Sequence, residues 1–319
     1  MKKLITICLL FATSCFAQIE GEGLDHGKLG LNRISSTIDS GLTAIDSIAN
    51  AVGTGVTLAD RVKDTYPALY GFKKLWSGAS DSCVILRRSS DNAELSFGFV
   101  NDLLDTASIR TWAGTDTLYV VSWHDQSGNY NDAIQTTAGN QPIYNDSLAI
   151  RFDDTDDYLR VTDNATINFG STTDFSLLAK VKRNAGTFIP IIVKRKQQGP
   201  TYQGYQLHLN TDNKLYAIVR DAGVTQVYPV SSSTIGADWV NISGTFNRDG
   251  NAQLYINSLA NGTPLNMTSV GDIDYAHDLL IGRTPYYYGG NAFYINNGLI
   301  SKYALTQTQI ESINTYLNQ

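Results

Sequence analysis

Carboxylate groups gather in one short stretch of the chain, formed by Asp153, Asp154, Asp156 and Asp157. Ca²⁺ is a hard cation that takes about six to eight oxygen ligands, many of them from side-chain carboxylates. The stretch therefore offers candidate ligands for calcium, although the spacing of its aspartates does not match an EF-hand loop. A solvated turn is the alternative explanation of the same residues.

Aromatic and amide side chains follow one another near the C-terminus, where Tyr286, Tyr287 and Tyr288 precede two glycines and Asn291. Flat aromatic rings stack on the apolar faces of sugars, and amide groups bond sugar hydroxyls. These four residues are therefore candidate contacts for a carbohydrate. An alternating strand that turns the same tyrosines toward a core is the alternative.

A polar segment, Asp125 to Asn129, follows an apolar run that ends at Trp123. Its glycine and polar neighbours are typical of a tight turn whose side chains bond their own backbone, and we favour that structural role. His124 and Asp125 are retained as further candidate ligand contacts. A second polar segment, from Arg87 to Asn92, predicts a clamp between arginine and carboxylate side chains that fixes loops.

The other titratable residues suggest no chemistry of their own. His26, His124, His208 and His277 are scattered, without metal-ligand spacing and without a nucleophile motif beside them. The formal net charge is −6 and the chain has no basic tract, which excludes nucleic acid as the expected partner.

Residues 1–17 have the features of a secretory signal peptide. Lys2 and Lys3 precede an apolar run, and small residues lead to a predicted cleavage site after Ala17. The alternatives are an uncleaved anchor, for which the apolar run is shorter than the ~20 residues a bilayer requires, and a lipoprotein attached through Cys15. Cleavage after Ala17 would leave Cys83 as the sole cysteine, so we expect no intramolecular disulfide.

The segment after the leader, residues 18–65, is predicted to be a helical extension. Its apolar residues recur at alternating steps of four and three, as in a heptad stripe. Such a helix either docks on its own domain or forms a stalk that associates with copies of itself. The stripe consists of Ile38, Leu42, Ile45, Ala49, Val52, Val56 and Ala59.

Residues 66–319 change to short apolar runs bounded by Asn, Asp and Gly, which is typical of antiparallel strands. Residues 211–214 and 248–251 have the chemistry of hairpin turns. Thr306 and Gln309 form a capping box that predicts a short C-terminal helix. The expected strands are 147–152, 175–182, 188–194, 205–209, 215–220, 240–246, 253–256, 279–281 and 299–303.

Two stretches resemble known families. Residues 69–135, with "LYGFKKLWSG", "VILRRSSDNAE" and "VVSWHDQSGNYNDAIQ", are similar to the amino-terminal part of the α-L-arabinofuranosidase B catalytic domain. Residues 147–319, with "LAIRFDDTDDYL", "WVNISGTFNRDGNAQLYIN" and "LLIGR", resemble a concanavalin A-like domain of the laminin-G type. Both resemblances imply an all-β fold, a concanavalin A-like antiparallel β-sandwich (jelly roll) over residues 66–319. In laminin-G-like domains the stretch equivalent to the acidic group is a turn, which favours that interpretation over a metal site.

The resemblance to the arabinofuranosidase also sets a test for catalysis, because glycoside hydrolysis requires two carboxylates at the scissile bond. The position that matches the family's nucleophilic Glu is Asp212, which is shorter and already explained as a hairpin-turn residue. The family's acid/base Asp follows an Ile-Gly motif, whereas Ile281 and Gly282 lead here into a stretch without a carboxylate. The family's adjacent cysteine pair has no counterpart either.

The leading hypothesis is a non-catalytic, lectin-like or adhesin-like protein that recognises cell-surface or extracellular polysaccharide. It would be exported by a bacterium or displayed on a phage particle as a receptor-binding spike, with Ile38 to Ala59 as a candidate oligomerisation segment. A hydrolase of the arabinofuranosidase type that uses Asp212, and a structural surface or virion protein that binds another protein, are the alternatives. No cofactor is expected, with calcium as the one candidate metal.

Overall fold

The computed structural model describes residues 65–318, except 77, 80, 154, 185–187, 196–201 and 286–291. The chain divides into two compact units, Met1–Gly55 and Val56–Gln319, and the account below concerns the second. The predicted signal peptide, the stalk from Ile38 to Ala59 and the tyrosines at 286–288 lie outside the described residues.

Strands are the main regular structure of the described chain, and every pairing between the described strands is antiparallel. Two α-helices, α3 (Thr106–Ala113) and α4 (Gln307–Leu317), and two single-turn 3₁₀ helices, η2 (Ala138–Asn140) and η3 (Ala165–Ile167), complete the described elements. The strands are β1 (Ala68–Gly71), β2 (Ser82–Arg88), β3 (Glu94–Val100), β4 (Leu103–Leu104), β5 (Leu118–Trp123), β6 (Ala133–Ile134), β7 (Ile143–Asn145), β8 (Ala149–Phe152), β9 (Leu159–Val161), β10 (Phe175–Arg183), β11 (Ile189–Arg195), β12 (Gly204–Leu209), β13 (Lys214–Arg220), β14 (Gln226–Val227), β15 (Val230–Thr234), β16 (Trp239–Phe246), β17 (Asn251–Ile256), β18 (Leu259–Asn266), β19 (Leu279–Ile281) and β20 (Phe293–Ser301).

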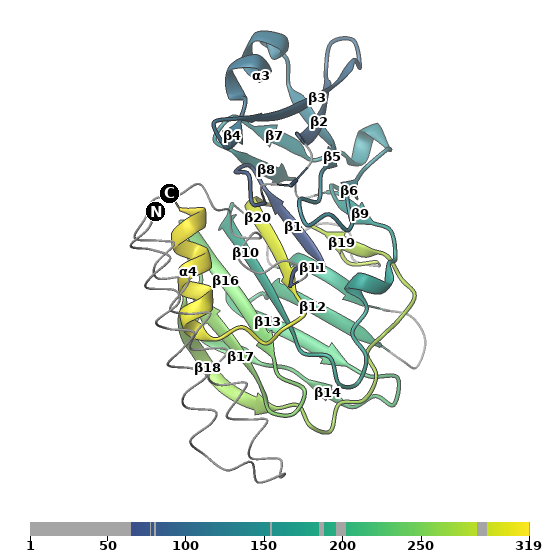
Figure 1. Ribbon diagram of the computed structural model, residues 1–319, viewed down its shortest axis with the longest axis vertical. Helices are drawn as coiled ribbons and strands as arrows, with labels where there is room; N and C mark the ends of the chain where they lie inside the picture. The colour runs from purple at the N-terminus through teal and green to yellow at the C-terminus, as the bar shows by residue number, and fades with distance from the viewer. Residues whose placement is uncertain are drawn as a thin grey trace, which may run out of the picture. The chain divides into compact units, whose positions relative to one another are not determined.

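The strands form two layers that face each other across one core (Figure 1). One layer runs β18–β17–β16–β10–β20, and the other runs β13–β12–β11–β19–β9. Strands β8, β7, β5 and β6 connect the two layers into a continuous hydrogen-bonded sheet. The predicted antiparallel β-sandwich is therefore confirmed.

Aromatic rings fill the space between the layers. Phe175 of β10 stacks on Phe246 of β16 with ring centroids 4.4 Å apart, and it also contacts Tyr205 of β12 at 5.3 Å. Phe169 stacks on Phe175 at 4.6 Å. Because β10 and β12 belong to different layers, these contacts fix the distance at which the layers pack.

The C-terminal helix α4 forms where the capping box predicts it. The Thr306 hydroxyl accepts a hydrogen bond from Gln309 N, and the Gln309 side chain accepts one from Thr306 N. The helix lies beside β10 and β16 (Figure 1), where Ile310 and Ile313 join a second apolar cluster with residues of the sandwich. Neither described α-helix is long and apolar enough to span a bilayer.

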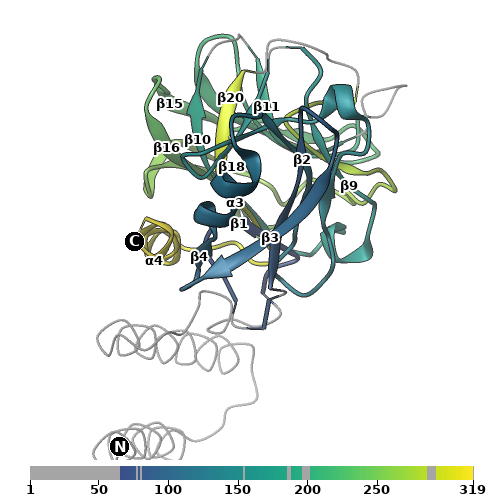
Figure 2. The same ribbon diagram turned by 90° about the horizontal axis from the view of Figure 1, so that it is seen from above.

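Helix α3 is a feature that the strand pattern did not predict. Its N-cap, Asp105, accepts a hydrogen bond from Ser108 N at 3.0 Å. Trp112 packs against Phe97 of β3 with ring centroids 5.5 Å apart, and the helix lies beside β3 in both views (Figures 1 and 2).

Both predicted hairpin turns are confirmed. Asn213 has a φ of 62° in the turn between β12 and β13, and Gly250 N donates to Asn247 O between β16 and β17. Strand β20 begins at Phe293, six residues before the predicted start at Leu299. The earlier half was missed because Asn296 and Asn297 interrupt its apolar pattern, although Asn297 is buried.

The turn after β5 is held by one buried carboxylate. Asp125 accepts hydrogen bonds from Leu69 N at 2.8 Å, Ser127 N at 2.9 Å, Ser127 Oγ at 2.7 Å and Asn131 N at 3.0 Å. Burial raises the pKa of Asp125, while these hydrogen bonds oppose that rise. The carboxylate therefore ties the end of β5 to β1, in the structural role that the sequence favours.

The two neighbouring arginines of β2 hold loops through different partners. Arg88 pairs with Asp91 at 2.6 Å and lies 3.7 Å from Asp116, which is the predicted arginine–carboxylate clamp. Arg87 instead donates to the amide oxygens of Gln141 and Asn92. The clamp is therefore made by Arg88 alone among the described residues.

We expect Asp125→Ala to lower the free energy of unfolding by at least about 2 kcal/mol, because buried backbone N–H groups lose their acceptor. Urea unfolding at neutral pH measures this. Asp146→Ala is the control, since Asp146 is exposed and pairs with an exposed arginine. A loss no larger than that of the control would contradict the role given to Asp125.

Candidate functional site

Strand β12 directs two different sets of side chains to its two faces. Tyr205, Leu207 and Leu209 point into the core between the layers, so the alternating residues Gln206 and His208 point to the outer face. The register pairs His208 with Tyr216 and Gln206 with Ile218 of β13. The outer face of β12 therefore continues onto β13.

An aromatic cluster covers one end of this outer face. The imidazole of His208 stacks on Tyr216 with ring centroids 5.5 Å apart and planes at 27°, and Phe188 lies 4.9 Å from His208 on its other flank. Tyr228 lies 5.2 Å from Tyr216 and is 39% exposed. We call the β12–β13 face the surface formed by Phe188, Arg195, Tyr202, Gln206, His208, Asp212, Tyr216, Arg220 and Tyr228.

Two polar side chains of the β12–β13 face are buried without satisfying all of their polar atoms. His208 and Gln206 are each 1% exposed. His208 Nδ1 and Gln206 Oε1 have no hydrogen-bond partner among the described residues. A buried polar atom without a partner costs about 1–3 kcal/mol unless water or a ligand bonds it. These are two of twelve such side-chain atoms among the described residues, and His208 lies in the aromatic cluster.

The imidazole of His208 is held in its neutral form. Burial lowers its pKa to about 3, the charge of Arg195 adds to this effect, and the charge of Asp212 opposes it. A neutral imidazole has one nitrogen that donates and one that accepts a hydrogen bond. His208 can therefore bond a hydroxyl group in either sense over the ordinary pH range.

Two arginines flank the opposite end of the face. Arg195 and Arg220 both pair with Gly204 in the sheet register, from β11 and β13. Both guanidinium groups lie over the ring of Tyr202, at 5.4 and 5.2 Å from its centroid. Gly204 has a φ of +122° and a Cβ there would lie 2.1 Å from Lys194 O, so a glycine is required between them.

Asp212 is the single carboxylate on the β12–β13 face. Its Oδ1 accepts a hydrogen bond from Lys214 N at 3.1 Å, and its Oδ2 accepts one from the Tyr216 hydroxyl at 2.8 Å. Desolvation raises the pKa of Asp212, but the hydrogen bonds from Tyr216 and Lys214 outweigh it and lower that pKa overall. Asp212 thus lies in its predicted turn, and its hydrogen bond with the Tyr216 hydroxyl orients that side chain.

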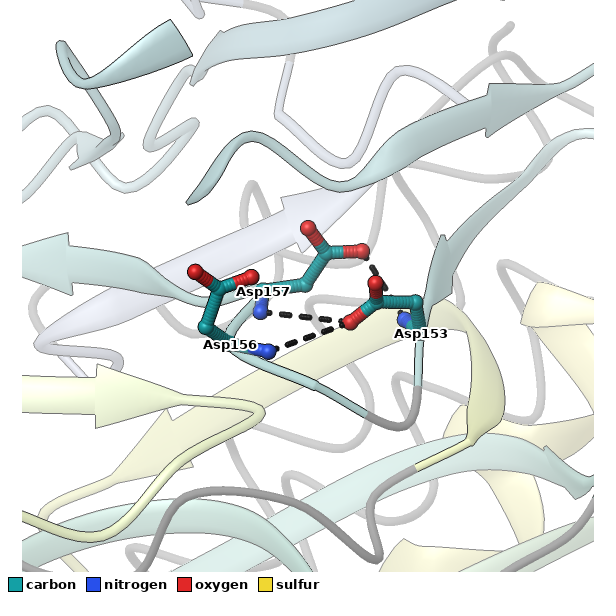
Figure 3. A group of neighbouring side chains, drawn as sticks. All are labelled: Asp153, Asp156 and Asp157. Carbon is teal, nitrogen blue, oxygen red and sulfur yellow. Dashed lines mark hydrogen bonds between the residues drawn. The ribbon is translucent and has the colours of Figure 1, made fainter. Parts of the chain in front are cut away.

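The acidic stretch is a self-bonded turn, shown in Figure 3. Asp153 Oδ1 accepts hydrogen bonds from Asp156 N at 3.2 Å and Asp157 N at 3.5 Å, and Asp157 Oδ2 accepts one from Asp153 N at 2.8 Å. One carboxylate oxygen from each of these three aspartates lies within 4.8 Å of the others. Asp154 lies outside the described residues. The sequence favours a turn here, and calcium binding stays the alternative.

The remaining predicted contacts are not brought together with the β12–β13 face by any described interaction. His124 Nδ1 lies 3.1 Å from Asp132 Oδ2, and Asp125 has the internal bonds described above. Tyr286, Tyr287, Tyr288 and Asn291 lie outside the described residues. Their role as ligand contacts, like that of His124 and Asp125, stays a prediction.

This architecture matches that of a known protein superfamily. Residues 153–311 match the family model described as the concanavalin A-like lectin/glucanases superfamily. The chain carries a concanavalin A-like domain of this superfamily. No curated protein sequence matches the chain.

Two solved structures share the fold of the concanavalin A-like domain at low sequence identity. An arabinofuranosidase complexed with arabinofuranosyl-α-1,2-xylobiose has a TM-score of 0.62 and 12% identity, and the match covers 80% of this chain and 63% of that chain. A mutant GH54 α-L-arabinofuranosidase soaked with 4-nitrophenyl α-L-arabinofuranoside has a TM-score of 0.60 and 13% identity, with the same coverage. This chain thus spans 63% of the length of the enzymes, and the likeness concerns the fold.

His208, Gln206 and Tyr228 were not candidates in the sequence analysis. A signal was present, because Gln206 and His208 alternate with apolar residues in a predicted strand. Alternation alone predicts a solvated face, however. Their burial depends on neighbouring strands, which the local pattern does not reveal.

We expect Asp157→Asn to stabilise the protein at pH 8 and much less at pH 4. Burial, with the charges of Asp153 and Asp156, raises the pKa of Asp157 to about 7. The unfolded carboxyl ionises near pH 4, so stability is lost as the pH rises from about 4 to 7, and the amide avoids this loss. The gain at pH 8 should be on the order of 1–3 kcal/mol, measured by urea unfolding.

Asp249→Asn is the control for this experiment, because Asp249 lies exposed in the turn between β16 and β17. The control should change stability by similar amounts at both pH values. An Asp157→Asn variant whose gain is the same at pH 4 and pH 8 would contradict the raised pKa.

Proposed function

We propose that the protein binds carbohydrate on the β12–β13 face and does not cleave it. The observation that carries this proposal is the burial of His208 Nδ1 and Gln206 Oε1 without partners beside the aromatic cluster. Tyrosine rings stack on the C–H faces of sugars, and hydroxyl groups bond to adjacent polar atoms. A sugar ring therefore supplies both kinds of contact that this surface offers.

The number of carboxylates favours binding over hydrolysis. Glycosidases place two carboxyl groups about 5–5.5 Å apart for retention or about 6.5–9.5 Å apart for inversion. The β12–β13 face carries Asp212 alone, and its oxygens already accept hydrogen bonds from Lys214 and Tyr216. Hydrolysis with Asp212 as nucleophile is the second candidate function, supported by the fold shared with arabinofuranosidases.

Further parts of the proposal concern the cellular setting. We propose that the protein is exported through the signal peptide at residues 1–17 and recognises cell-surface or extracellular polysaccharide. It would be exported by a bacterium or displayed on a phage particle. The heptad stripe from Ile38 to Ala59 supports an oligomer in either setting. A structural surface or virion protein that binds another protein is the competing hypothesis.

We expect the wild-type chain to bind members of a glycan array, and Tyr216→Ala to lower the affinity for the bound glycan by about tenfold or more, because a stacking ring is lost. Isothermal titration calorimetry with the best array glycan measures the change. Tyr303→Ala is the matched control, since Tyr303 is 53% exposed and lies after β20, away from β12 and β13 in the sequence.

Absence of any bound glycan for a folded wild-type protein would sink the carbohydrate proposal and favour a protein partner. Hydrolysis of an aryl arabinofuranoside, abolished by Asp212→Asn, would instead establish the second candidate. Equal losses in Tyr216→Ala and Tyr303→Ala would show that the β12–β13 face is not the binding surface.

A further inference from the structure

The two arginines of the β12–β13 face lack an acidic partner. Neither Arg195 nor Arg220 forms an ion pair with a described carboxylate. Arg195 Nε donates to Tyr202 O at 3.1 Å, and Arg220 Nη1 donates to Gln226 Oε1 at 3.2 Å. Arg220 Nε is buried and has no hydrogen-bond partner among the described residues. Several guanidinium N–H groups are thus left for a ligand.

The arrangement of these charges is unfavourable without an anion. Both guanidinium groups lie within 5.4 Å of the same Tyr202 ring and are partly buried. Burial lowers the pKa of Arg195 to about 10, and the like charge of Arg220 adds to that effect. An oxyanion between the two groups would relieve this repulsion and complete their hydrogen bonds.

Guanidinium groups are also chemically selective. Their planar fork of N–H donors matches the paired oxygens of a carboxylate or sulfate and can bind them through two parallel hydrogen bonds. A neutral sugar hydroxyl offers no such pair of oxygens. The two arginines therefore favour a ligand with an acidic group over its neutral counterpart.

We propose that Arg195 and Arg220 form an anion subsite, and that the ligand of the β12–β13 face is an acidic sugar bearing a carboxylate or a sulfate. This inference rests on the proposed carbohydrate-binding function and specifies the class of glycan. The buried His208 and Gln206 then bond hydroxyl groups of the same ligand, between the arginines and the aromatic cluster.

The position of Asp212 determines at which end of β12 the acidic group of the ligand lies. The arginines flank Gly204 at the start of the strand, whereas Asp212 follows its end. Six residues of an extended strand cover roughly 20 Å, which is long enough for more than one sugar ring. The carboxylate of Asp212 repels an acidic group, so that group lies at the arginine end.

The test is a binding panel with matched pairs of probes. Oligosaccharides of galacturonate, glucuronate and N-acetylneuraminate are compared with their methyl esters, and sulfated oligosaccharides are compared with their desulfated forms. We expect wild-type protein to bind at least one acidic probe about tenfold or more tightly than its neutral counterpart, with an affinity that falls as salt increases.

Three variants separate the anion subsite from the carbohydrate face. The double variant Arg195→Gln/Arg220→Gln should lose the preference for the acidic probe while retaining its affinity for the neutral counterpart. Tyr216→Ala should weaken both. Arg110→Gln is the matched control, since Arg110 lies on α3 and pairs with Asp146, and it should leave both affinities unchanged. Thermal unfolding of each variant confirms that it is folded.

The outcomes distinguish the two proposals. Binding of neutral glycans without any preference for acidic probes would overturn the anion subsite and leave the carbohydrate proposal standing. A preference that persists in the double variant would also overturn it. Failure of wild-type protein to bind any probe would overturn both. Preference for the carboxylated or for the sulfated pairs identifies which oxyanion the arginines recognise.

Discussion

The alternation of inward and outward side chains along β12 and β13 is the constraint on which the candidate site depends. Leu207 and Leu209 must face the core, so Gln206 and His208 must face outward. A shift of one residue in the register would exchange the two sets and bury polar groups between the layers. Packing of the sandwich core therefore determines the position of the side chains of the candidate site.

Much of the fold follows from local patterns in the sequence. The alternating runs predict β10, β12, β13 and β16 closely, and the capping box predicts α4, because these signals are contained within a few residues. Strand β18 and the first half of β20 were missed, since polar residues interrupt their apolar patterns. Strand β18 pairs with its neighbour β17, whereas β20 pairs with the distant β10. Helix α3 had a usable signal in its cap, Asp105 with Ser108.

The candidate site could be predicted only in part. Asp212 was found through its turn chemistry, which is local, and the structure confirms that turn. His208 was set aside as scattered, because the sequence does not show that Phe188, Tyr216 and Tyr228 surround it. These contacts join β12 and β13 with two connecting segments, which contain Phe188 and Tyr228, and they depend on the register of the sheet.

Asp125 and His208 are both buried, but they differ in how many of their polar atoms form hydrogen bonds. The carboxylate of Asp125 accepts hydrogen bonds from three residues of its own domain, whereas His208 Nδ1 and the neighbouring Gln206 Oε1 have no partner in the described chain. Burial lowers the pKa of His208, so its ring stays neutral, and the hydrogen bonding that it can offer does not change with pH over the ordinary range.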